Sequence, residues 1–423
     1  MQQISLKRDS GRRTATTLLI LIAALLFFCA GTALAKEKKR ATGDPFVISK
    51  KTSSSKKSVR LKVTAAWKKK LGTRTPWGKL KEIGGHGNSS RPVVYGDTLY
   101  IGSGRKVFYA LDLVSGDLRW KFKARSMIDG DSAVEGNMVC FGTVAGVLHC
   151  LDKNSGKELW SFNARSDIIA APVISKRYVY FTSTEDRVYA LERKSGKKIW
   201  SYSAFAPHYV MPRVVSSPIL RDTDVGKRLF MLLANGSITC LDAARGKEVW
   251  SRKVITSKIN AVERARRRVE GNETELFVID DRGVVVAINH KDGKVKESYP
   301  VIKTIDFVIS GEKIYLLGEE LLVAVERKSG KVLWSTGLDY GKPFSLELSG
   351  EHLVVVSTMT EVPFNFKYLA HTYGYVSSYF TATGDESWNK KFKTPVTAIN
   401  VSNAKTMALV DSKEVLRVFR TEQ

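Results

Sequence analysis

Short stretches of alternating apolar and polar residues follow one another along most of this chain. Residues 178–183 and 187–192 alternate with the two-residue period of β-strands and are joined by a short polar turn. A tight reversal at a glycine then leads into residues 198–203, which alternate in the same way. Together with an earlier strand at residues 170–175, the pattern predicts four antiparallel strands in a unit of about 40 residues.

The end of this unit recurs along the chain as a glycine followed four residues later by a tryptophan. The pairs are Gly116/Trp120, Gly156/Trp160, Gly196/Trp200, Gly246/Trp250, Gly330/Trp334 and Gly384/Trp388. A degenerate copy has Gly293 with Glu297 in the tryptophan position, and Trp67 implies one further unit. A four-stranded sheet that is apolar on both faces must stack on its neighbours, and radial stacking of such sheets gives a β-propeller.

The two ends of the repeated region complete each other. The last segment offers only three strands, at residues 396–401, 406–411 and 415–420. The missing fourth strand is present at the start of the region, where residues 63–68 alternate around Trp67. We therefore expect an all-β fold over residues 63–423, an eight-bladed β-propeller closed by pairing of its N- and C-terminal strands.

The first 35 residues have the composition of an export signal. Residues 1–13 carry four basic side chains and one acid, and an uncharged stretch from Thr14 to Ala35 ends in Ala33-Leu34-Ala35. This order is typical of a signal peptide cleaved after Ala35. An uncharged stretch of about 20 residues can also be retained as a membrane anchor. Both possibilities place the rest of the chain outside the cytoplasm.

Residues 36–62 hold ten Lys or Arg residues and two acids, and they show no strand or helix periodicity. We expect a disordered basic linker that either touches anionic lipid head groups or acts only as a spacer. The whole chain is also basic, with 68 Lys+Arg against 42 Asp+Glu and a net charge of +26. This excess favours an anionic partner. An exported chain meets little nucleic acid, so phospholipid, lipopolysaccharide or an acidic protein is the expected partner.

The repeat that runs from Ala110-Leu-Asp112 through Gly116 to Trp120 resembles that of quinoprotein (PQQ-like) eight-bladed propellers. Over residues 63–423 the chain is similar to the BamB family of outer-membrane protein assembly factors. The resemblance implies a non-catalytic periplasmic scaffold. Such a protein works as a monomer within a complex, and its partners are envelope proteins that include the outer-membrane barrel-assembly protein.

Two segments are candidate partner-binding loops. In the BamB family, the loop after the third Gly-x-x-x-Trp unit contacts the barrel-assembly protein through apolar residues and an arginine. The matching residues here are Val210, Pro212 and Arg213. The aspartate pair of the family's second contact has no match near residues 258–262. The insertion at residues 359–373 adds aromatic side chains suited to a protein interface, namely Phe364, Phe366 and Tyr368.

The faces of the propeller can be assigned from connection types. The loop with Arg213 joins the fourth strand of one blade to the first strand of the next. The insertion at residues 359–373 joins a second strand to a third strand. We expect both connection types on the same face. We expect the insertions at residues 221–228 and 263–273 between first and second strands, on the opposite face. The second of these would carry a basic cluster made of Arg264, Arg266, Arg267 and Arg268.

Other functions remain as alternatives. A PQQ-dependent dehydrogenase would be expected to have adjacent cysteines over its cofactor, a calcium site and large loops. Here Cys140, Cys150 and Cys240 are far from adjacent, and the six histidines show no metal-ligand spacing. We therefore predict no catalytic, cofactor-binding or metal-binding residues. A polyanion- or lipid-binding envelope protein, acting through the linker and the basic cluster, is the other alternative.

Cys140 and Cys150 lie on the two arms of one predicted hairpin, nearly opposite each other. An oxidising compartment would permit a bridge between them. Directly paired strand positions seldom suit disulfide geometry, so we expect buried free thiols.

Overall fold

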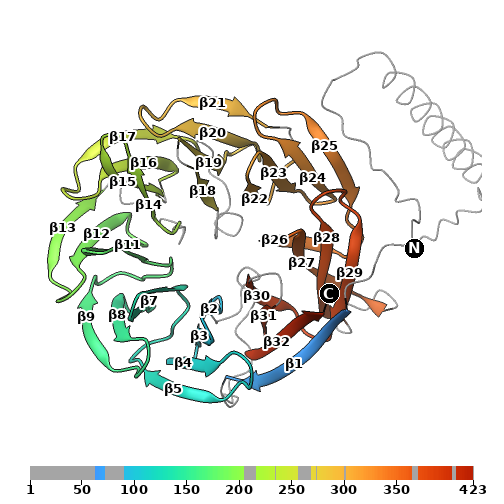
Figure 1. Ribbon diagram of the computed structural model, residues 1–423, viewed down its shortest axis with the longest axis horizontal. Coiled ribbons are helices and arrows are strands. Elements are labelled where there is room, and N and C mark those ends of the chain that lie inside the picture. The colour runs from blue at the N-terminus through green and yellow to red at the C-terminus, as the bar shows by residue number, and fades with distance from the viewer. Residues whose placement is uncertain are drawn as a thin grey trace, which may run out of the picture. The chain divides into compact units, whose positions relative to one another are not determined.

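The computed structural model consists of eight four-stranded antiparallel sheets arranged in a ring (Figure 1). Within each sheet the strands pair in chain order, and the first strand lies nearest the axis of the ring. The eight-bladed propeller predicted from the repeats is thereby confirmed. The structure describes residues 62–71, 90–203, 216–233, 235–255, 268–272, 274–299, 302–363, 370–402 and 406–422.

The first four blades follow the repeat closely. Blade 1 comprises β2 (Val93–Tyr95), β3 (Thr98–Gly102), β4 (Val107–Asp112) and β5 (Leu118–Lys123). Blade 2 comprises β6 (Ser132–Glu135), β7 (Met138–Gly142), β8 (Val147–Asp152) and β9 (Glu158–Asn163). Blade 3 comprises β10 (Val173–Ile174), β11 (Tyr178–Ser183), β12 (Arg187–Glu192) and β13 (Lys198–Ser203). Blade 4 comprises β14 (Ile219–Thr223), β15 (Gly226–Leu232), β16 (Ser237–Asp242) and β17 (Glu248–Lys253).

The remaining blades vary more in strand length. Blade 5 comprises β18 (Val269–Gly271), β19 (Glu275–Ile279), β20 (Val285–Asn289) and β21 (Val295–Ser298). Blade 6 comprises β22 (Asp306–Ser310), β23 (Lys313–Leu317), β24 (Leu321–Glu326) and β25 (Val332–Gly337). Blade 7 comprises β26 (Lys342–Ser349), β27 (His352–Glu361), β28 (His371–Phe380) and β29 (Glu386–Phe392). Blade 8 comprises β30 (Val396–Ser402), β31 (Thr406–Asp411), β32 (Val415–Glu422) and β1 (Lys62–Lys70).

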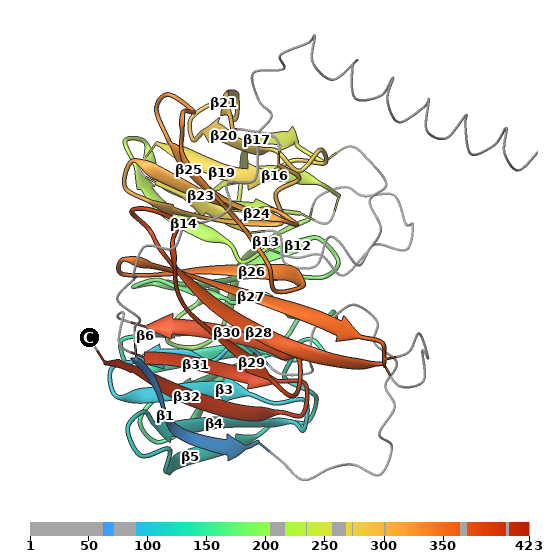
Figure 2. The same ribbon diagram turned by 90° about the vertical axis from the view of Figure 1, so that its right-hand side faces the viewer.

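Blade 8 closes the ring as predicted. β1, from the start of the propeller, pairs antiparallel with β32, from its end, with Trp67 opposite Val418 (Figure 2). Backbone hydrogen bonds between β1 and β32 therefore complete this blade, whereas in the other blades a turn joins the third strand to the fourth. No helix of membrane-spanning length and apolarity occurs among the residues that the structure describes.

Burial follows the position of each strand within its blade. The second and third strands are almost fully buried, as in β7, where all five residues are buried. The fourth strands are mostly exposed, and all four residues of β21 are exposed. The apolar clusters lie between neighbouring sheets: one of them joins Cys140 and Leu148 of blade 2 to Val179 and Phe181 of blade 3. Each sheet is thus held by the sheets on both sides of it, as in other stacked repeat proteins.

The tryptophans of the repeat hold neighbouring blades together. Trp200, on the outer strand of blade 3, donates its indole N–H to the carbonyl of Ala243 in blade 4 at 3.1 Å. Its ring covers Gly246, where an added Cβ would lie 2.5 Å from the indole. Gly246 also has a φ of +69°, which favours glycine. We call this combination the tryptophan latch. The same indole–carbonyl bond is made by Trp67, Trp120, Trp160, Trp250 and Trp334.

Two blade junctions lack the latch. Between blades 5 and 6 the tryptophan position is Glu297, and the hydroxyl of Tyr299 donates to the carbonyl of Arg327 at 3.0 Å instead. An added Cβ at Gly330, the glycine of that junction, would meet nothing within 4 Å. Between blades 7 and 8, Trp388 faces the blade that the two chain ends share. That blade has no turn between its third and fourth strands, because these are β32 and β1.

The connections separate into two faces. In a four-stranded meander, turns between strands 1 and 2 and between strands 3 and 4 emerge on one side, which we call the turn face. Connections between strands 2 and 3, and from strand 4 to the next blade, emerge on the other side, which we call the loop face. The segments at residues 204–215 and 256–267 both join a fourth strand to the next first strand, so they belong to the loop face.

The face assignment corrects one prediction. β18 begins at Val269, so Arg264, Arg266 and Arg267 precede the first strand of blade 5 instead of following it. The predicted basic insertion between first and second strands is therefore wrong. Residues 221–228 do connect first and second strands, but they form the ends of β14 and β15 joined by a tight turn at Asp224 and Val225.

Candidate functional site

The residues predicted to bind partners all lie outside the residues that the structure describes. They are Val210, Pro212, Arg213, Phe364, Phe366 and Tyr368. The described residues show how the two loops that carry them are anchored. Both loops leave the propeller on the loop face, because one joins β13 to β14 and the other joins β27 to β28.

The chain after the first loop is fixed to blades 3 and 4. The Ser216 hydroxyl accepts the backbone N–H of Leu232 at 2.8 Å and donates to the carbonyl of the same residue at 3.1 Å. The hydroxyl of Ser217 accepts the backbone N–H of Ala171 from blade 3 at 3.1 Å. The residues that follow the loop with Arg213 are therefore hydrogen-bonded to blade 3 through Ser217 and to blade 4 through Ser216.

The second loop closes the longest hairpin of the molecule. β27 and β28 have ten residues each and stay paired to Glu361 and His371. Lys391 of β29 supports the outer part of this hairpin: its ammonium lies 2.7 Å from the Glu361 carboxylate and 3.7 Å from the centre of the Tyr373 ring. The stem below the predicted aromatic tip is therefore held against β29. Figure 2 shows the two long strands side by side.

A second candidate site, which the sequence did not reveal, lies where the inner strands approach the axis of the ring. Arg268 directly precedes β18, and its guanidinium lies 3.0 Å from Glu347 of β26 in blade 7. The same group lies 3.2 Å from Glu270 and 3.4 Å from Asp306 of blade 6. Backbone donors complete these contacts, with Ile309 donating to Glu270 and Leu346 to Asp306.

Arg91 extends the network to the opposite side of the ring. It precedes β2 in blade 1, and its guanidinium lies 2.9 Å from Glu347 and 3.8 Å from Asp131 of blade 2. Glu347 thus accepts both arginines, although blades 5, 7 and 1 are not neighbours in the ring. We call these six residues the axial cluster: Arg91, Asp131, Arg268, Glu270, Asp306 and Glu347.

Burial and charge pairing set the ionisation of the axial cluster. Burial alone would lower the pKa of Arg268, but the carboxylates of Asp306 and Glu347 outweigh it and raise the pKa. Burial raises the pKa of Asp306 and that of Glu270 above their ordinary values, against the opposing effect of Arg268. Both arginines therefore stay charged, and Glu270 and Asp306 are the groups whose pKa is displaced toward protonation.

A cavity lined by both apolar and charged side chains lies beside the axial cluster. It has a volume of about 340 Å³ and is lined by inner strands of blades 3 to 5, including Val173, Ile219 and Val269. Glu270 and Arg221 line it as well, and Arg221 donates to the carbonyl of Gly271 at 2.9 Å. The cavity wall therefore combines apolar side chains with the guanidinium of Arg221 and the carboxylate of Glu270. Glu270, Asp306 and Glu347 all lie in first strands, but no local pattern marks them: β26, for example, also contains Lys342, Ser345 and Ser349.

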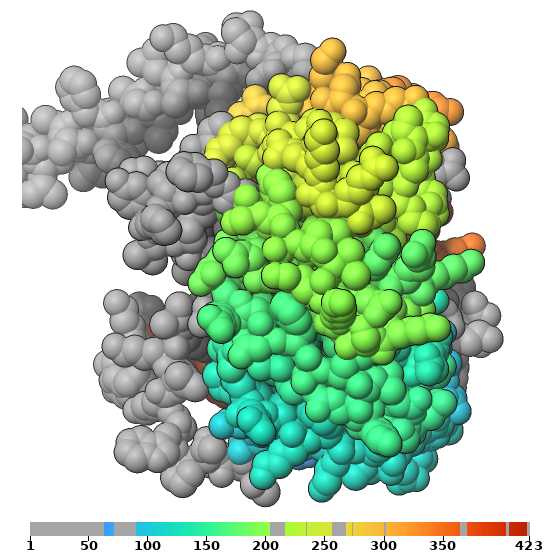
Figure 3. Space-filling model, turned by 90° about the vertical axis from the view of Figure 1, so that its left-hand side faces the viewer, coloured from blue at the N-terminus to red at the C-terminus, as the bar shows by residue number. Residues whose placement is uncertain are grey.

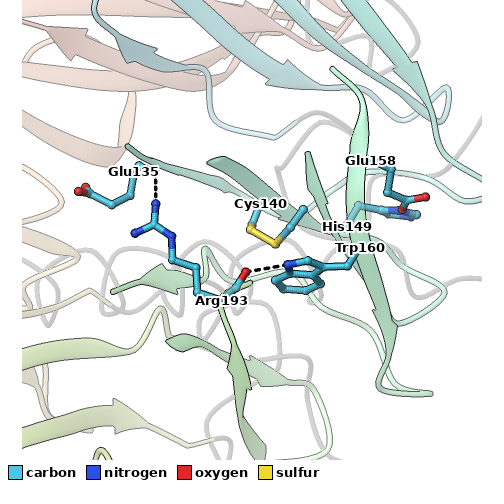
Figure 4. The surroundings of a disulfide bond; sticks show 7 residues. Glu135, Cys140, His149, Glu158, Trp160 and Arg193 are labelled. Atoms are coloured by element: carbon cyan, nitrogen blue, oxygen red, sulfur yellow. Dashed lines mark hydrogen bonds and ion pairs between the residues drawn. A yellow bond between two sulfur atoms is a disulfide. The ribbon is translucent and has the colours of Figure 1, made fainter. Parts of the chain in front are cut away.

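The cysteine prediction is wrong. The structure joins Cys140 of β7 to Cys150 of β8 in a disulfide (Figure 4). The two residues are directly opposite in the hairpin, with Cα atoms 4.2 Å apart, the close spacing of a non-hydrogen-bonded strand pair. The bridge lies in the apolar core beneath Trp160, and Cys240 is a buried free thiol.

The disulfide also bears on the quinoprotein alternative. Its cysteines are ten residues apart on neighbouring strands, so they do not form the adjacent pair expected over a quinone cofactor. Over the described ranges no group of three or more His, Cys, Asp or Glu side chains could hold a metal ion. His149 instead pairs with Glu158 at 2.7 Å and packs against Phe122 and Phe141. Among the described residues, Cys140 and Cys150 therefore do not supply the adjacent pair expected over a quinone.

The family model described as outer membrane protein assembly factor BamB matches residues 63–143, 126–296 and 265–422. The chain belongs to the BamB family. The three matches together cover the whole propeller, as expected from its eight repeats. No curated protein sequence matches the chain.

Solved structures share the fold at low identity. BamB from Moraxella catarrhalis is 17% identical, with a TM-score of 0.64, over 85% of this chain and 99% of that one. Quinohemoprotein alcohol dehydrogenase from Comamonas testosteroni is 13% identical, with a TM-score of 0.59, over 85% of this chain and 76% of that one. A europium-containing methanol dehydrogenase is 12% identical, with a TM-score of 0.60, over 85% of this chain and 93% of that one. These similarities show the propeller architecture alone.

Proposed function

We propose that this protein is a non-catalytic periplasmic scaffold that assists the assembly of outer-membrane β-barrel proteins by binding a component of the assembly machinery. The observation that carries the proposal is the match of the BamB family model across the entire propeller. The acting residues would be Val210, Pro212 and Arg213, with Phe364, Phe366 and Tyr368 as a second contact.

The anchoring of the two loops supports this assignment. Their flanking residues are tied to the sheets by Ser216, Ser217 and Lys391, and both loops belong to the loop face. Both loops therefore leave the propeller on the same side. Aromatic and arginine side chains are the residue types that dominate binding energy at protein interfaces.

The experiment is affinity capture of the full-length protein from native envelopes after crosslinking, with recovery of the outer-membrane barrel-assembly protein as the readout. The Arg213→Glu variant should recover about tenfold less of it, because a charge reversal at a contact opposes the partner's charge. The matched control is Arg125→Glu, an exposed arginine in the equivalent connection between blades 1 and 2. Identical recovery by wild type and both variants would overturn the loop assignment.

The dehydrogenase alternative makes a separate prediction. An enzyme of that class would reduce an artificial dye with alcohols or sugars after addition of pyrroloquinoline quinone and calcium. We expect no dye reduction, since the disulfide and the axial cluster do not provide the expected cofactor residues. Substrate-dependent dye reduction would overturn the assignment as a scaffold.

Export is part of the proposal. Residues 1–35 would direct the chain across the inner membrane, and residues 36–62 would link the propeller to the envelope. N-terminal sequencing of protein purified from the envelope distinguishes the two forms. A sequence starting at Lys36 would identify a cleaved signal peptide, and an intact N-terminus would identify a retained anchor.

A further inference from the structure

The cavity beside the axial cluster carries two opposite charges that do not pair with each other. Arg221 of β14 and Glu270 of β18 both line it, and they lie on the first strands of the neighbouring blades 4 and 5. The guanidinium of Arg221 lies 2.9 Å from the carbonyl of Gly271, the residue next to Glu270. No ion pair of Arg221 with a carboxylate is found in the part of the chain that the structure describes. The cavity therefore presents a guanidinium and a carboxylate at neighbouring positions of its wall.

Arg221 is held in place but keeps donors for a ligand. Its guanidinium donates to the backbone carbonyls of Leu220 at 3.0 Å and of Gly271 at 2.9 Å. Arginine has five N–H donors in a planar fork, so three of them are not used by these two bonds. A guanidinium whose position is already set loses little freedom when it binds a carboxylate through two parallel hydrogen bonds. Arg221 is therefore suited to bind a carboxylate inside the cavity.

Glu270 belongs to a cluster that contains more acids than cations. The axial cluster has four carboxyl groups and two guanidinium groups. One carboxylate oxygen of Glu270 accepts Arg268 at 3.2 Å, and the other accepts the backbone N–H of Ile309 at 3.0 Å. A carboxylate can accept about four hydrogen bonds, so Glu270 can accept further donors from the cavity. An ammonium group there would offset the excess of negative charge in the axial cluster.

The rest of the cavity wall suits an aliphatic or aromatic group. Val173 of blade 3, Ile219 and Leu220 of blade 4 and Val269 of blade 5 line it. Its volume of about 340 Å³ lies at the small end of the range for small-molecule sites. The outer side of blades 2 to 4 forms a continuous surface (Figure 3), and the cavity is lined mainly by first strands, which lie nearest the axis. A small ligand would therefore enter from the axis of the ring.

We propose that this cavity binds a free α-amino acid with an apolar side chain. The carboxylate of the ligand pairs with Arg221, its ammonium group pairs with Glu270, and its side chain packs against the valine and isoleucine side chains of the wall. A wholly apolar ligand would leave both charges desolvated and unpaired. An anion without an ammonium group would face Glu270, and a cation without a carboxylate would face Arg221. A small zwitterion compensates both charges and fits the volume.

This inference goes beyond the proposed scaffold function, because it concerns a small ligand bound near the axis of the ring. Its test changes Arg221 and Glu270, whereas partner capture is tested at Arg213. A failure of amino-acid binding would leave the capture result as it is. A failure of partner capture would likewise leave the binding result as it is.

The first test is calorimetric titration of the unaltered full-length protein with L-leucine, for which we expect one site per chain. Leucine amide lacks the carboxylate and N-acetyl-leucine lacks the ammonium group. Each should bind about tenfold more weakly or less, because one charge of the cavity is left unpaired. Glycine keeps both charges but lacks the side chain, and it should also bind about tenfold more weakly. Absence of binding by leucine, isoleucine and phenylalanine, or equal binding of leucine and either blocked analogue, would overturn the proposal.

A variant of the arginine assigns the carboxylate of the ligand to its partner. Arg221→Gln should weaken leucine binding about tenfold and remove the preference for leucine over leucine amide, because the group that recognises the carboxylate is gone. The matched control is Arg228→Gln on β15. Arg228 is the strand partner of Arg221, but it pairs with Asp242 and does not line the cavity. The control should keep both affinity and preference. Equal losses of affinity for leucine and its amide in Arg221→Gln would contradict the proposed pairing and overturn the proposal.

A variant of the acid makes the reciprocal assignment. Glu270→Gln should remove the preference for leucine over N-acetyl-leucine, because the group that recognises the ammonium is gone. The matched control is Glu275→Gln on β19, whose side chain is 17% exposed and pairs with Lys296. Glu270 also pairs with Arg268, so thermal unfolding first checks that the variant is folded. If it is not, the analogue series on the unaltered protein decides the proposal. An unchanged preference in folded Glu270→Gln would show that another group binds the ammonium, and the proposal would then be wrong.

Discussion

The junction of blades 3 and 4 and the junction of blades 5 and 6 hold neighbouring sheets together in different ways. In the first, Trp200 covers Gly246 and donates to the carbonyl of Ala243 at 3.1 Å. In the second, no ring covers Gly330, and Tyr299 makes the only comparable bond among the described residues, to the carbonyl of Arg327. The outer part of the second junction is therefore the less packed of the two.

The inner part of the second junction carries the bonds that the outer part lacks. Arg268 of blade 5 lies 3.4 Å from Asp306 of blade 6, and Glu270 accepts the backbone N–H of Ile309. Apolar contact on the outer strands thus stabilises the junction of blades 3 and 4, and charge pairing on the inner strands stabilises the junction of blades 5 and 6. They differ in their response to pH and to mutation, which makes the comparison testable.

The largest effect should come from the axial cluster. Arg268→Met removes the cation that serves three carboxyl groups and should lower the free energy of unfolding by about 4 kcal/mol. Urea unfolding at neutral pH measures the loss. The control is Arg282→Met, whose side chain is 70% exposed and pairs with Asp280, so its loss should stay below about 1 kcal/mol. Equal losses in the two variants would contradict a structural role for the axial cluster.

The loss in Arg268→Met should also depend on pH. Glu270 and Asp306 have a raised pKa in the folded protein, so the folded state binds protons more strongly than the unfolded state. Their contribution to stability is therefore present at pH values below their ordinary pKa and is lost as pH rises through the raised pKa. Removing Arg268 raises both pKa values further. The variant should thus lose less stability at mildly acidic pH than at neutral pH, relative to wild type.

The next effect should come from the latch itself. Trp200→Ala removes the apolar contact and the indole–carbonyl bond between blades 3 and 4, and should lower the free energy of unfolding by about 3 kcal/mol. This loss should not change between mildly acidic and neutral pH, because no titrating group of the axial cluster contacts Trp200. A pH dependence equal to that of Arg268→Met would remove the distinction between the two junctions.

A smaller effect should distinguish the contact made by the tryptophan ring from the backbone strain of the turn that the ring covers. Gly246→Ala and Gly330→Ala impose the same backbone strain, since φ is +69° and +67° at the two positions. Only at Gly246 would the new Cβ lie 2.5 Å from a tryptophan ring. We expect Gly330→Ala to cost about 1 kcal/mol from strain alone. Gly246→Ala should cost about 1 kcal/mol more, because overpacking is added. Equal midpoints of thermal unfolding would show that the ring contact is not tight.

The smallest effect should follow from Tyr299→Phe. This change removes one hydroxyl bond to the carbonyl of Arg327 and keeps the buried ring, so it should cost about 1 kcal/mol. Thermal unfolding is sensitive enough to detect it. Tyr373→Phe, on the long hairpin of blade 7, is a suitable control, since no hydrogen bond of its hydroxyl is found among the described residues. A loss in that control as large as in Tyr299→Phe would show that the bond at the blade 5–6 junction adds nothing.

Much of the fold was predictable because it is repeated. The spacing of Gly196 and Trp200, seen six times, predicted the turns, the outer strands and the number of blades, and the incomplete set of strands at each end predicted the pairing of β1 with β32. The loop with Val210, Pro212 and Arg213 was found by family resemblance and that at residues 359–373 by its aromatic composition, and both stay predictions. The axial cluster was missed because Arg91, Arg268 and Glu347 are up to 256 residues apart and no local pattern connects them.

The amino-acid sequence by itself determined the blade, its turn and its stacking partner, because these depend on contacts between residues of one unit and the next. The tertiary structure decided which charged side chains meet at the axis, because ring closure brings together side chains from blades that are distant along the chain. The disulfide also depended on the tertiary structure. The spacing of Cys140 and Cys150 placed them in one hairpin, but only the strand register brought their Cα atoms to within 4.2 Å of each other.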